Sequence, residues 1–333
     1  SIMELVFNDT VKAGTAEIYN KLKKSIPDLE WPVLAPYIFQ INKIKKENNF
    51  VILAHNYQTP DIFYGIADVV GDSLGLAIKG SKVKERNILM CGVHFMAETA
   101  KIMSPEKKVY LPDMQAGCSL AESITAEDIR KLKKKYPDVP VVTYVNTSAD
   151  VKSETDICCT SANAVKVVES LGVDEVIFLP DEYLAKYVSL NTNVKIISWK
   201  GKCEVHEKFS KKDILEIKSR YKDLEVVSHP ECPPDVIAAS DFTGSTGSMI
   251  NHVKNTKAKN IFLVTECSMS DNVQIENPNI NFIKPCNLCP HMKKIELPKI
   301  LDCLKNYKNE IKIDPDIAKN AKKAISRMIE VGR

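Results

Sequence analysis

Three cysteines recur at nearly equal distances along the 333-residue chain, and their thiol groups are well suited to bind a metal. Cys118, Cys203 and Cys289 are separated by 85 and 86 positions, and each follows a β-like run and a short turn. A free cysteine is often simply a buried residue, but equal spacing indicates that one structural element is used three times. The buried interpretation is favoured for the other candidates, Cys91, Cys158, Cys159, Cys232, Cys267 and Cys303.

Three thiolates are one ligand short of a structural zinc site, which normally has four nitrogen or sulfur ligands. A 4Fe–4S cluster bound by three cysteines instead keeps one iron open, and an open metal ion can act as a Lewis acid. Cys286 could complete a ligand set, and Cys286-x-x-Cys289 on its own would indicate zinc or redox chemistry, but the repeat period selects Cys289 of this pair. His206 could also be a ligand, although a role in orienting substrate or in hydrogen bonding to a cluster sulfur is favoured.

A polar group that ends a predicted strand recurs at the same period, as Tyr57, Tyr144 and His229, which are 87 and 85 positions apart. Neighbouring residues add further imidazole, amide and carboxylate groups, which suit repeated proton transfer. The alternative is that these polar residues simply hydrogen-bond to loops at the strand ends. The candidate acid–base and polar residues are His55, Tyr57, Tyr144, Asn146, His229 and Glu231.

A hydroxyl residue just before a predicted helix is the third repeated feature. Ser73, Ser161 and Thr246 are 88 and 85 positions apart. The first backbone N–H groups of a helix and its dipole favour a phosphate or carboxylate, although a hydroxyl in this position is usually only an N-cap. The glycine-containing run 244–248 strengthens the anion-binding interpretation at the third helix. Three such helix starts at one point would suit a small substrate with several negative charges.

The segments that must position these residues alternate between strand-like and helix-like patterns from residue 50 onward. Such alternation predicts parallel sheets with helical crossovers, and ligands then bind beyond the carboxyl ends of the strands. We therefore expect an α/β protein with three similar small parallel-sheet domains, arranged with pseudo-threefold symmetry around a central iron–sulfur site. The expected division is a helical lead-in over 1–48, α/β domains over 49–135, 136–222 and 223–292, and a helical tail over 293–333 that packs back on the body.

The composition is ordinary for a globular protein, with 44% hydrophobic and 27% charged residues. A net charge of +3 gives no sign of nucleic-acid or membrane binding. No apolar run approaches the roughly 20 residues of a membrane span, and the N-terminal sequence lacks the apolar stretch of a signal peptide. Ten cysteines without a secretion signal indicate a reducing compartment, where metal binding or catalysis is favoured over disulfides. We expect a cytoplasmic protein.

At the residues already singled out, the chain also resembles the quinolinate synthase family, the A protein of de novo NAD biosynthesis. The resemblance extends over roughly residues 50–300, in the family order. The matching stretches are residues 53–58 (LAHNYQ), 71–74 (GDSL), 91–100 (CGVHFMAETA), 117–121 (GCSLA), 143–149 (TYVNTSA), 229–232 (HPEC) and 244–246 (GST).

The resemblance implies a condensing enzyme of the transferase and dehydratase type. It would join iminoaspartate and dihydroxyacetone phosphate to form quinolinate, with loss of phosphate and water. It also implies one 4Fe–4S cluster per chain bound by Cys118, Cys203 and Cys289, and a functional link to an enzyme that produces iminoaspartate. No nucleic-acid or membrane partner is implied. The catalytic candidates are Tyr57, Glu231, His55, Tyr144 and His229, and the substrate-binding candidates are His55, Ser73, Tyr144, Asn146, Ser161, His229, Glu231 and Thr246.

The alternative class is a non-catalytic iron–sulfur or zinc protein, such as a redox sensor or an electron carrier. An electron carrier usually binds its cluster with four thiolates. It would also have no need for phenol, carboxylate and hydroxyl groups at the same period as the cysteines. The enzyme is therefore the favoured interpretation.

Overall fold

The chain forms three separate parallel sheets. The computed structural model describes residues 5–284 and 287–333. The first sheet contains β1 (Phe50–His55), β2 (Val69–Gly71), β3 (Asn87–Cys91) and β4 (Lys108–Tyr110). The second contains β5 (Val141–Tyr144), β6 (Ile157–Cys159), β7 (Glu175–Leu179) and β8 (Lys195–Ser198). The third contains β9 (Leu224–Ser228), β10 (Phe242–Thr243), β11 (Asn260–Val264) and β12 (Asn281–Ile283).

The three sheets share one topology. Their strand orders are β2-β1-β3-β4, β6-β5-β7-β8 and β10-β9-β11-β12, and all of these pairings are parallel. This confirms the expected α/β class with three similar units. Strands β1, β3 and β5 are buried along their whole length and read as nearly continuous apolar runs, as expected for parallel sheets covered on both faces.

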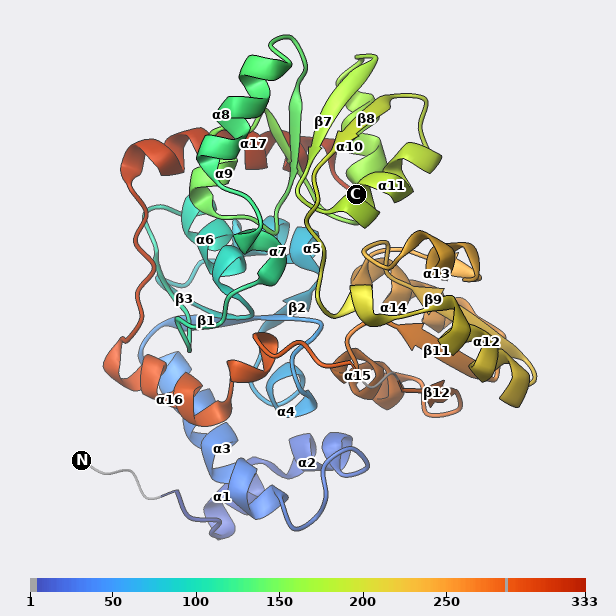
Figure 1. Cartoon of the computed structure of the whole chain (residues 1–333). Coiled ribbons are helices and arrows are strands. Elements are labelled where there is room, and N and C mark those ends of the chain that lie inside the picture. The colour runs from blue at the N-terminus through green and yellow to red at the C-terminus, as the bar shows by residue number, and fades with distance from the viewer. Residues whose placement is uncertain (1–4, 285–286) are drawn as a thin grey trace.

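Short helices connect the strands and cover the sheets (Figure 1). The first unit has α4 (Pro60–Phe63), α5 (Ser73–Gly80), α6 (His94–Met103), α7 (Ser119–Glu122) and α8 (Ala126–Lys135). The second has α9 (Ala149–Ser153), α10 (Ala164–Ser170), α11 (Glu182–Leu190), the 3-10 turn η1 (His206–Lys208) and α12 (Lys211–Arg220). The third has α13 (Pro234–Ala238), α14 (Thr246–Asn255), α15 (Ser268–Glu276) and the 3-10 turn η2 (Met292–Lys294).

Helices at both ends of the chain pack on this body. The lead-in comprises α1 (Asp9–Gly14), α2 (Ala16–Leu22) and α3 (Trp31–Glu47), and the tail comprises α16 (Leu297–Asn306) and α17 (Pro315–Val331). Helix α16 packs on α3, whereas α17 packs on α9 and β6 of the second unit and on α6 of the first. The domain boundaries expected from the sequence stay a prediction.

The hydrophobic core is shared unequally among the units. The largest buried cluster combines the lead-in, the first two sheets and the tail, including Ala324 and Ile325 of α17. The two faces of the third sheet instead have clusters of their own, one containing Val227 and the other Val226. The third unit therefore has a core of its own, and only a few apolar residues, such as Ile275 and Met292, join it to the largest cluster.

The strand register corrects how the repeats align with one another. Leu53 pairs with Val69, Val142 with Ile157 and Val227 with Phe242. The equivalent strand-end residues are therefore His55, Tyr144 and His229, and, two positions later, Tyr57, Asn146 and Glu231. Aligning Tyr57 with Tyr144 and His229 was therefore wrong. The distance along the chain from the end of β1 to the end of β5 is two residues longer than the spacing of 87 positions that this alignment assumed.

An aspartate directly before β2, β6 and β10 makes the same pair of hydrogen bonds to the neighbouring central strand, β1, β5 or β9. Its carboxylate accepts the backbone N–H of a central-strand residue, and its own N–H donates to the carbonyl of that same residue. The aspartates Asp68, Asp156 and Asp241 bind Ile52, Val141 and Val226, with N–H to carboxylate distances of 2.8, 2.7 and 2.8 Å. This contact sets where the second strand of each sheet begins.

Among the described residues, none of the helices combines the length and apolar character needed to span a bilayer.

Replacing Asp156 with Ala should lower the free energy of unfolding by about 1–3 kcal/mol, because the N–H of the fully buried Val141 would lose its carboxylate partner. Chemical denaturation followed by circular dichroism would measure the change. Asp138→Ala is the control, since Asp138 is exposed and surface substitutions usually change stability by no more than about 0.5 kcal/mol. Equal stability of the two variants would contradict the assigned role of Asp156.

Candidate metal and acid–base site

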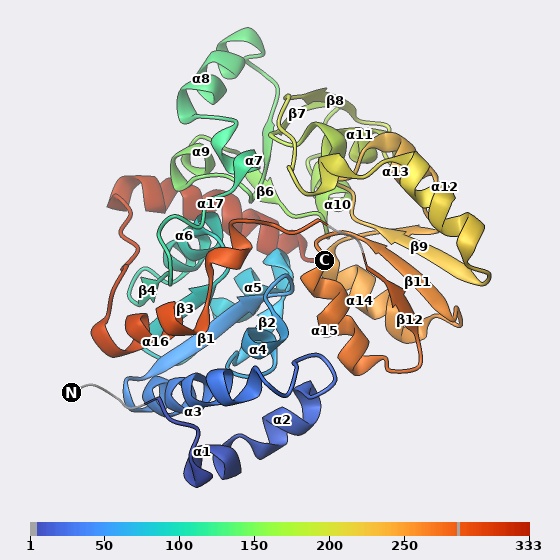
Figure 2. The same ribbon diagram turned by 60° about the horizontal axis from the view of Figure 1, so that its bottom comes forward.

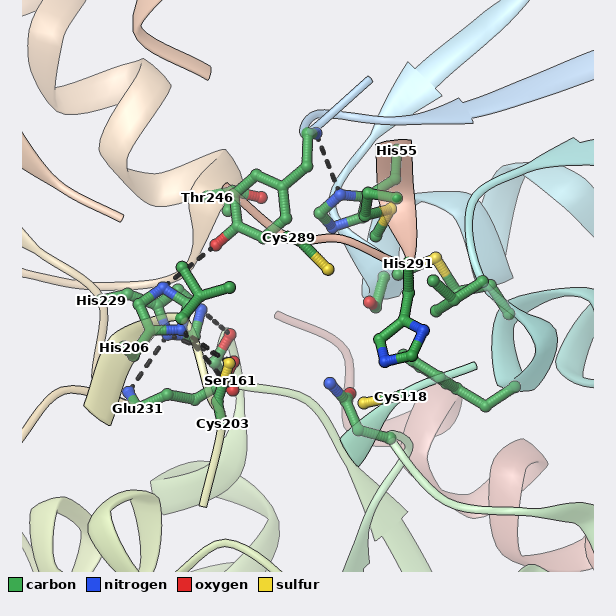
Figure 3. A pocket seen from close by; sticks show the side chains of 18 of the residues that line it. His55, Cys118, Ser161, Cys203, His206, His229, Glu231, Thr246, Cys289 and His291 are labelled. Atoms are coloured by element: carbon green, nitrogen blue, oxygen red, sulfur yellow. Dashed lines mark hydrogen bonds and ion pairs between the residues drawn. The ribbon is translucent and has the colours of Figure 1, made fainter. Parts of the chain in front are cut away.

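One cavity lies where the three units meet, and every site residue predicted from the sequence lines it. The predicted residues that line the cavity are His55, Tyr57, Ser73, Cys118, Tyr144, Asn146, Ser161, Cys203, His229, Glu231, Thr246 and Cys289. Figure 3 shows Cys118, Cys203 and Cys289 entering it from three different parts of the chain. The carboxyl ends of β1, β5 and β9 therefore face a common space, although positions in the cavity do not by themselves assign chemical roles.

The three cysteines begin equivalent helical turns. The carbonyls of Cys118, Cys203 and Cys289 accept the N–H of the residue four positions later, at 3.1, 2.9 and 3.2 Å. These turns are α7, η1 and η2. Backbone N–H groups two and three positions after each cysteine also hydrogen-bond to its sulfur. The repeat period detected in the sequence thus corresponds to one local structure that directs a sulfur and two N–H donors into the cavity.

Burial raises the pKa of each of these thiols, that of Cys118 to about 12. A buried thiolate requires a cation nearby, and a metal centre supplies one. Sulfurs bound to a single zinc ion lie at most about 4.6 Å apart. Within the described part of the chain, the three cysteines do not form a group with ligand atoms all within 4.8 Å. Their wider separation fits a multi-iron cluster better than one ion. Cys286 lies outside the described residues.

A tighter group lies on one side of the cavity. The ligand atoms of Cys203, His206 and Glu231 are all within 4.8 Å of one another, and His206 Nδ1 lies 3.1 Å from Cys203 Sγ. This contact agrees with the favoured interpretation that His206 hydrogen-bonds to a metal-bound sulfur. The same three residues are also the best candidates here for a mononuclear site.

Tyr144 and Glu231 form a buried phenol–carboxyl pair that joins the second and third units. Tyr144 Oη donates to Glu231 Oε1 at 2.9 Å. Burial raises the pKa of Glu231 to about 7, against the opposing hydrogen bonds from Tyr144 and Cys203. Burial, followed by the nearby Glu231 charge, raises the pKa of Tyr144 well above its usual value. A carboxyl group with a pKa near 7 can both accept and release a proton at neutral pH.

Two histidines occupy equivalent places and share one local geometry. The N–H of Tyr57 donates to His55 Nδ1, and the N–H of Glu231 donates to His229 Nδ1, both at 3.1 Å. Each Nδ1 is therefore an acceptor, so a neutral ring carries its proton on Nε2. In His229 this nitrogen lies 3.3 Å from Ser161 Oγ. Both imidazoles can thus donate a hydrogen bond from Nε2.

Thr265 is a site residue that the sequence analysis missed. Its hydroxyl contacts Tyr57 Oη at 2.5 Å and His206 Nε2 at 2.8 Å, so it links a phenol to an imidazole. Burial, more than the nearby charge of Glu231, raises the pKa of Tyr57 well above its usual value. Thr265 directly follows β11, the strand after β10 in the third unit. A polar residue at the end of that strand was the sequence feature that could have identified it.

The hydroxyl residues at the helix starts lie on the cavity wall, but their surroundings differ. Thr246 Oγ1 accepts a hydrogen bond from Asn56 Nδ2 at 3.0 Å. Asn146 is held differently, because Lys152 Nζ donates to the carbonyls of Val145 and Thr147 on either side of it. Asn146 Oδ1 is buried and has no hydrogen-bond partner among the described residues. Asn146 lines the cavity, so this acceptor is available to a bound ligand.

Comparison with known proteins covers nearly the entire chain. Residues 39–330 match a family model described as quinolinate synthetase A protein. The chain is 57% identical to the quinolinate synthase of Sinorhizobium fredii, over 98% of this chain and 91% of that protein. It is 54% identical to quinolinate synthase 2 of Mesorhizobium japonicum, over 97% and 99% of the two chains. Identity to the quinolinate synthase of Caulobacter vibrioides is 52%, over 98% and 90%.

His55 should remain neutral and carry its proton on Nε2 throughout the neutral pH range, because burial lowers its pKa to about 4 despite the opposing charge of Asp72. Nitrogen-15 NMR of the full-length chain, labelled at histidine and prepared without iron, would show this between pH 6 and 8. His55→Gln assigns the signal. A titration midpoint near the ordinary value of about 6.5, or a proton on Nδ1, would contradict the geometry described.

Proposed function

The chain belongs to the quinolinate synthetase A protein family, and from that premise we propose that it condenses iminoaspartate with dihydroxyacetone phosphate to quinolinate, releasing phosphate and water. The observation that carries the proposal beyond family membership is the meeting of Cys118, Cys203 and Cys289 with a set of buried acid–base groups in one cavity. The reaction consists of condensation, proton transfers and eliminations, and it needs no external electron donor.

Cys118, Cys203 and Cys289 would hold a 4Fe–4S cluster, one per chain, which when bound would supply an open iron as a Lewis acid for oxygen atoms of the substrate. Their equivalent turns support this assignment, since each sulfur already accepts two backbone N–H groups. Hydrogen bonds to the sulfurs are one of the means by which a protein stabilises a cluster.

Proton transfer is assigned to two groups that both lie against His206. Glu231, with its pKa raised to about 7 by burial, would accept and return protons at its carboxylate, and the Tyr144 hydroxyl would stabilise the ionised form. Tyr57 would donate a proton from its phenol to the substrate, and the contacts of its Oη with Thr265 Oγ1, and of Thr265 Oγ1 with His206 Nε2, would orient it. General acid–base catalysis of this kind contributes typically about 10²–10⁴-fold to a rate.

Substrate binding is assigned to the remaining polar groups. The hydroxyls of Ser73, Ser161 and Thr246, at or near helix N-termini, would bind the carboxylates and the phosphate. His55 and His229 would donate from Nε2 to substrate oxygens, and Asn146 Oδ1 would accept from a substrate N–H or O–H. Enclosure by three units would exclude water from the imine, which water would otherwise hydrolyse.

In the same proposal, the imine is produced by a separate enzyme and the reaction takes place in the cytoplasm. The ten cysteines of the chain fit a reducing compartment, in which thiols remain available to bind metal.

One observation bears on the alternative, a non-catalytic zinc protein, which the family match and the named relatives do not favour. The close group of Cys203, His206 and Glu231 could hold a single ion such as zinc. This candidate gives no role to Cys118, Cys289 or the hydroxyls of Ser73, Ser161 and Thr246. Metal content therefore discriminates between the two functions.

Changing Cys118, Cys203 or Cys289 to Ala should each abolish the cluster, whereas anaerobically prepared wild type should contain about four iron and four sulfide per chain. Iron and sulfide analysis measures this directly. Cys91→Ala and Cys303→Ala are matched controls, because both thiols are buried elsewhere in the core, and they should retain iron. Stoichiometric zinc without sulfide would overturn the cluster assignment and favour the mononuclear protein. Loss of the cluster on changing Cys286 but not Cys289 would reassign the ligand.

Tyr57→Phe and Glu231→Gln should retain fold and iron but lower turnover by about 10²–10⁴-fold, since each removes a titratable group and little volume. The assay follows quinolinate formation from dihydroxyacetone phosphate and enzymatically generated iminoaspartate under anaerobic conditions. Absence of quinolinate with the iron-loaded wild type would refute the proposed function. Near-normal rates in both variants would instead leave the function standing and refute the two assigned roles.

A further inference from the structure

Gly332 and Arg333, the two residues that follow α17, contact the helix starts of the first and second units. Asn163, just before α10, donates from Nδ2 to the carbonyl of Gly332 at 2.8 Å and accepts the N–H of Thr160 at the same distance. The Arg333 side chain extends to the first unit, where it binds Asp72, the N-cap of α5. Figure 2 shows this end of the chain between α5, α10 and α14.

Asp72 is the residue on which this junction depends. Both of its carboxylate oxygens accept from the Arg333 guanidinium at 2.9 Å. Its Oδ1 also accepts the N–H of Gly75 at 2.8 Å, and its Oδ2 accepts from Ser245 Oγ at 3.1 Å. Since Ser245 is the N-cap of α14, a single carboxylate joins the start of α5 in the first unit to the start of α14 in the third.

The same carboxylate lies on the wall of the central cavity, beside the groups assigned to bind anions. Asp72 directly precedes Ser73, and Ser245 directly precedes Thr246. Of these four residues, Asp72, Ser73 and Thr246 line the cavity. Burial would raise the pKa of Asp72, but the hydrogen bonds and charge of Arg333, together with Gly75 and Ser245, hold it below its ordinary value. Asp72 is therefore ionised, and an ionised carboxylate without a counter-charge would repel a phosphate or carboxylate bound there.

Arg333 is the cation that neutralises it. Its guanidinium fork matches a carboxylate in two parallel hydrogen bonds, which fix direction as well as charge. Arg333 lines a neighbouring cleft on the other side of Asp72 and is not among the residues lining the central cavity. Any effect of Arg333 on substrate must therefore be exerted through Asp72.

Two glycines beside the Arg333–Asp72 pair leave the space that the Asp72 carboxylate occupies. A Cβ atom at Gly247, in the first turn of α14, would lie 2.6 Å from Asp72 Oδ2, too close for an unshifted structure. One at Gly75 would lie 3.2 Å from Asp72 Oδ1. The third unit has core clusters of its own, so this polar junction is one of the contacts that fix it against the first.

We propose that Arg333 is a positioning residue for the binding of the phosphorylated substrate. It neutralises Asp72 and holds the starts of α5 and α14 together, so that Ser73 and Thr246 can bind one anionic substrate between them. This inference rests on the proposed function for the identity of the substrate. The requirement for a neutralised Asp72 concerns small anions in general.

The test compares Arg333→Gln, Arg333→Lys and the double variant Asp72→Asn/Arg333→Gln with wild type. Arg327→Gln is the matched control, because Arg327 lies near the end of α17, shortly before Arg333, and donates to the carbonyl of Asp156, away from the cavity. All proteins are loaded with iron, and iron content and thermal unfolding are measured first. Arg333 is 48% exposed, but Asp72 is only 6% exposed, so Arg333→Gln leaves a buried carboxylate without its counter-charge and should lower thermal stability. The double variant should restore stability, and the iron content of all variants should match that of the control.

Arg333→Gln should raise KM for dihydroxyacetone phosphate by about tenfold, as expected for unscreened like-charge repulsion. Its kcat should stay within about twofold of wild type, which is the signature of lost substrate binding. Arg333→Lys should have an intermediate KM, since a lysine keeps the charge without the fork. The double variant should have a KM close to that of wild type, because an amide at position 72 needs no counter-charge. Calorimetry with inorganic phosphate and with quinolinate should show the same order of affinities.

Several outcomes would overturn the proposal. An unchanged KM and unchanged phosphate affinity in Arg333→Gln would do so, as would a fall in kcat alone. If Arg333→Gln lost iron or stability and the double variant did not restore it, Arg333 would be structural only. Failure of the proposed function would look different, because the wild-type enzyme would then form no quinolinate. Calorimetry with inorganic phosphate would still decide the role of Arg333 in that case.

Discussion

Parallel strand pairing is the constraint on which the rest of the structure depends. In each unit the central strand, β1, β5 or β9, runs in the same direction as its neighbours, so all carboxyl ends of a sheet lie at one edge. Three sheets with these edges turned inward surround one cavity. Every residue given a chemical role in the cavity ends a strand, follows a strand end, or lies at or near the start of the helical element after it. Helical crossovers in turn cover the sheet faces and allow the central strands to be almost entirely apolar.

Burial of so many ionisable groups is costly, and the fold offsets part of this cost with repeated local contacts. The cysteine sulfurs and the Nδ1 atoms of His55 and His229 all accept backbone N–H groups from residues just after them. These donors come from the main chain, so they are positioned by the turn itself. The low-dielectric surroundings that make burial costly also raise the pKa of Glu231 to about 7 and lower that of His55 to about 4. The same burial therefore prepares a proton acceptor and two neutral hydrogen-bond donors.

The three units are alike in topology but not in how they are attached. The first two share a hydrophobic cluster with the tail, whereas the third has clusters of its own and meets the others through polar contacts such as Tyr144–Glu231 and Asp72–Ser245. Polar contacts across such a junction depend on exact placement more than apolar packing does. Since the cavity needs residues from all units, the residues that fix the third unit also fix the geometry of the site.

Sequence periodicity alone identified three α/β units, the three cysteines and the three helix-start hydroxyls, because these features are local and recur in every unit. Periodicity could not align the strand ends correctly, because loop lengths differ between units. Only the strand register shows that His55, Tyr144 and His229 occupy equivalent positions in the three sheets. Three sets of contacts join residues that are far apart in the sequence. They are the Tyr144–Glu231 hydrogen bond, over 87 positions, the link from Tyr57 through Thr265 to His206, over 208 and then 59 positions, and the Arg333–Asp72 pair, over 261 positions. No local pattern encodes such contacts. They exist only because separate sheets and the end of α17 are packed against one another, so the tertiary structure alone decided them.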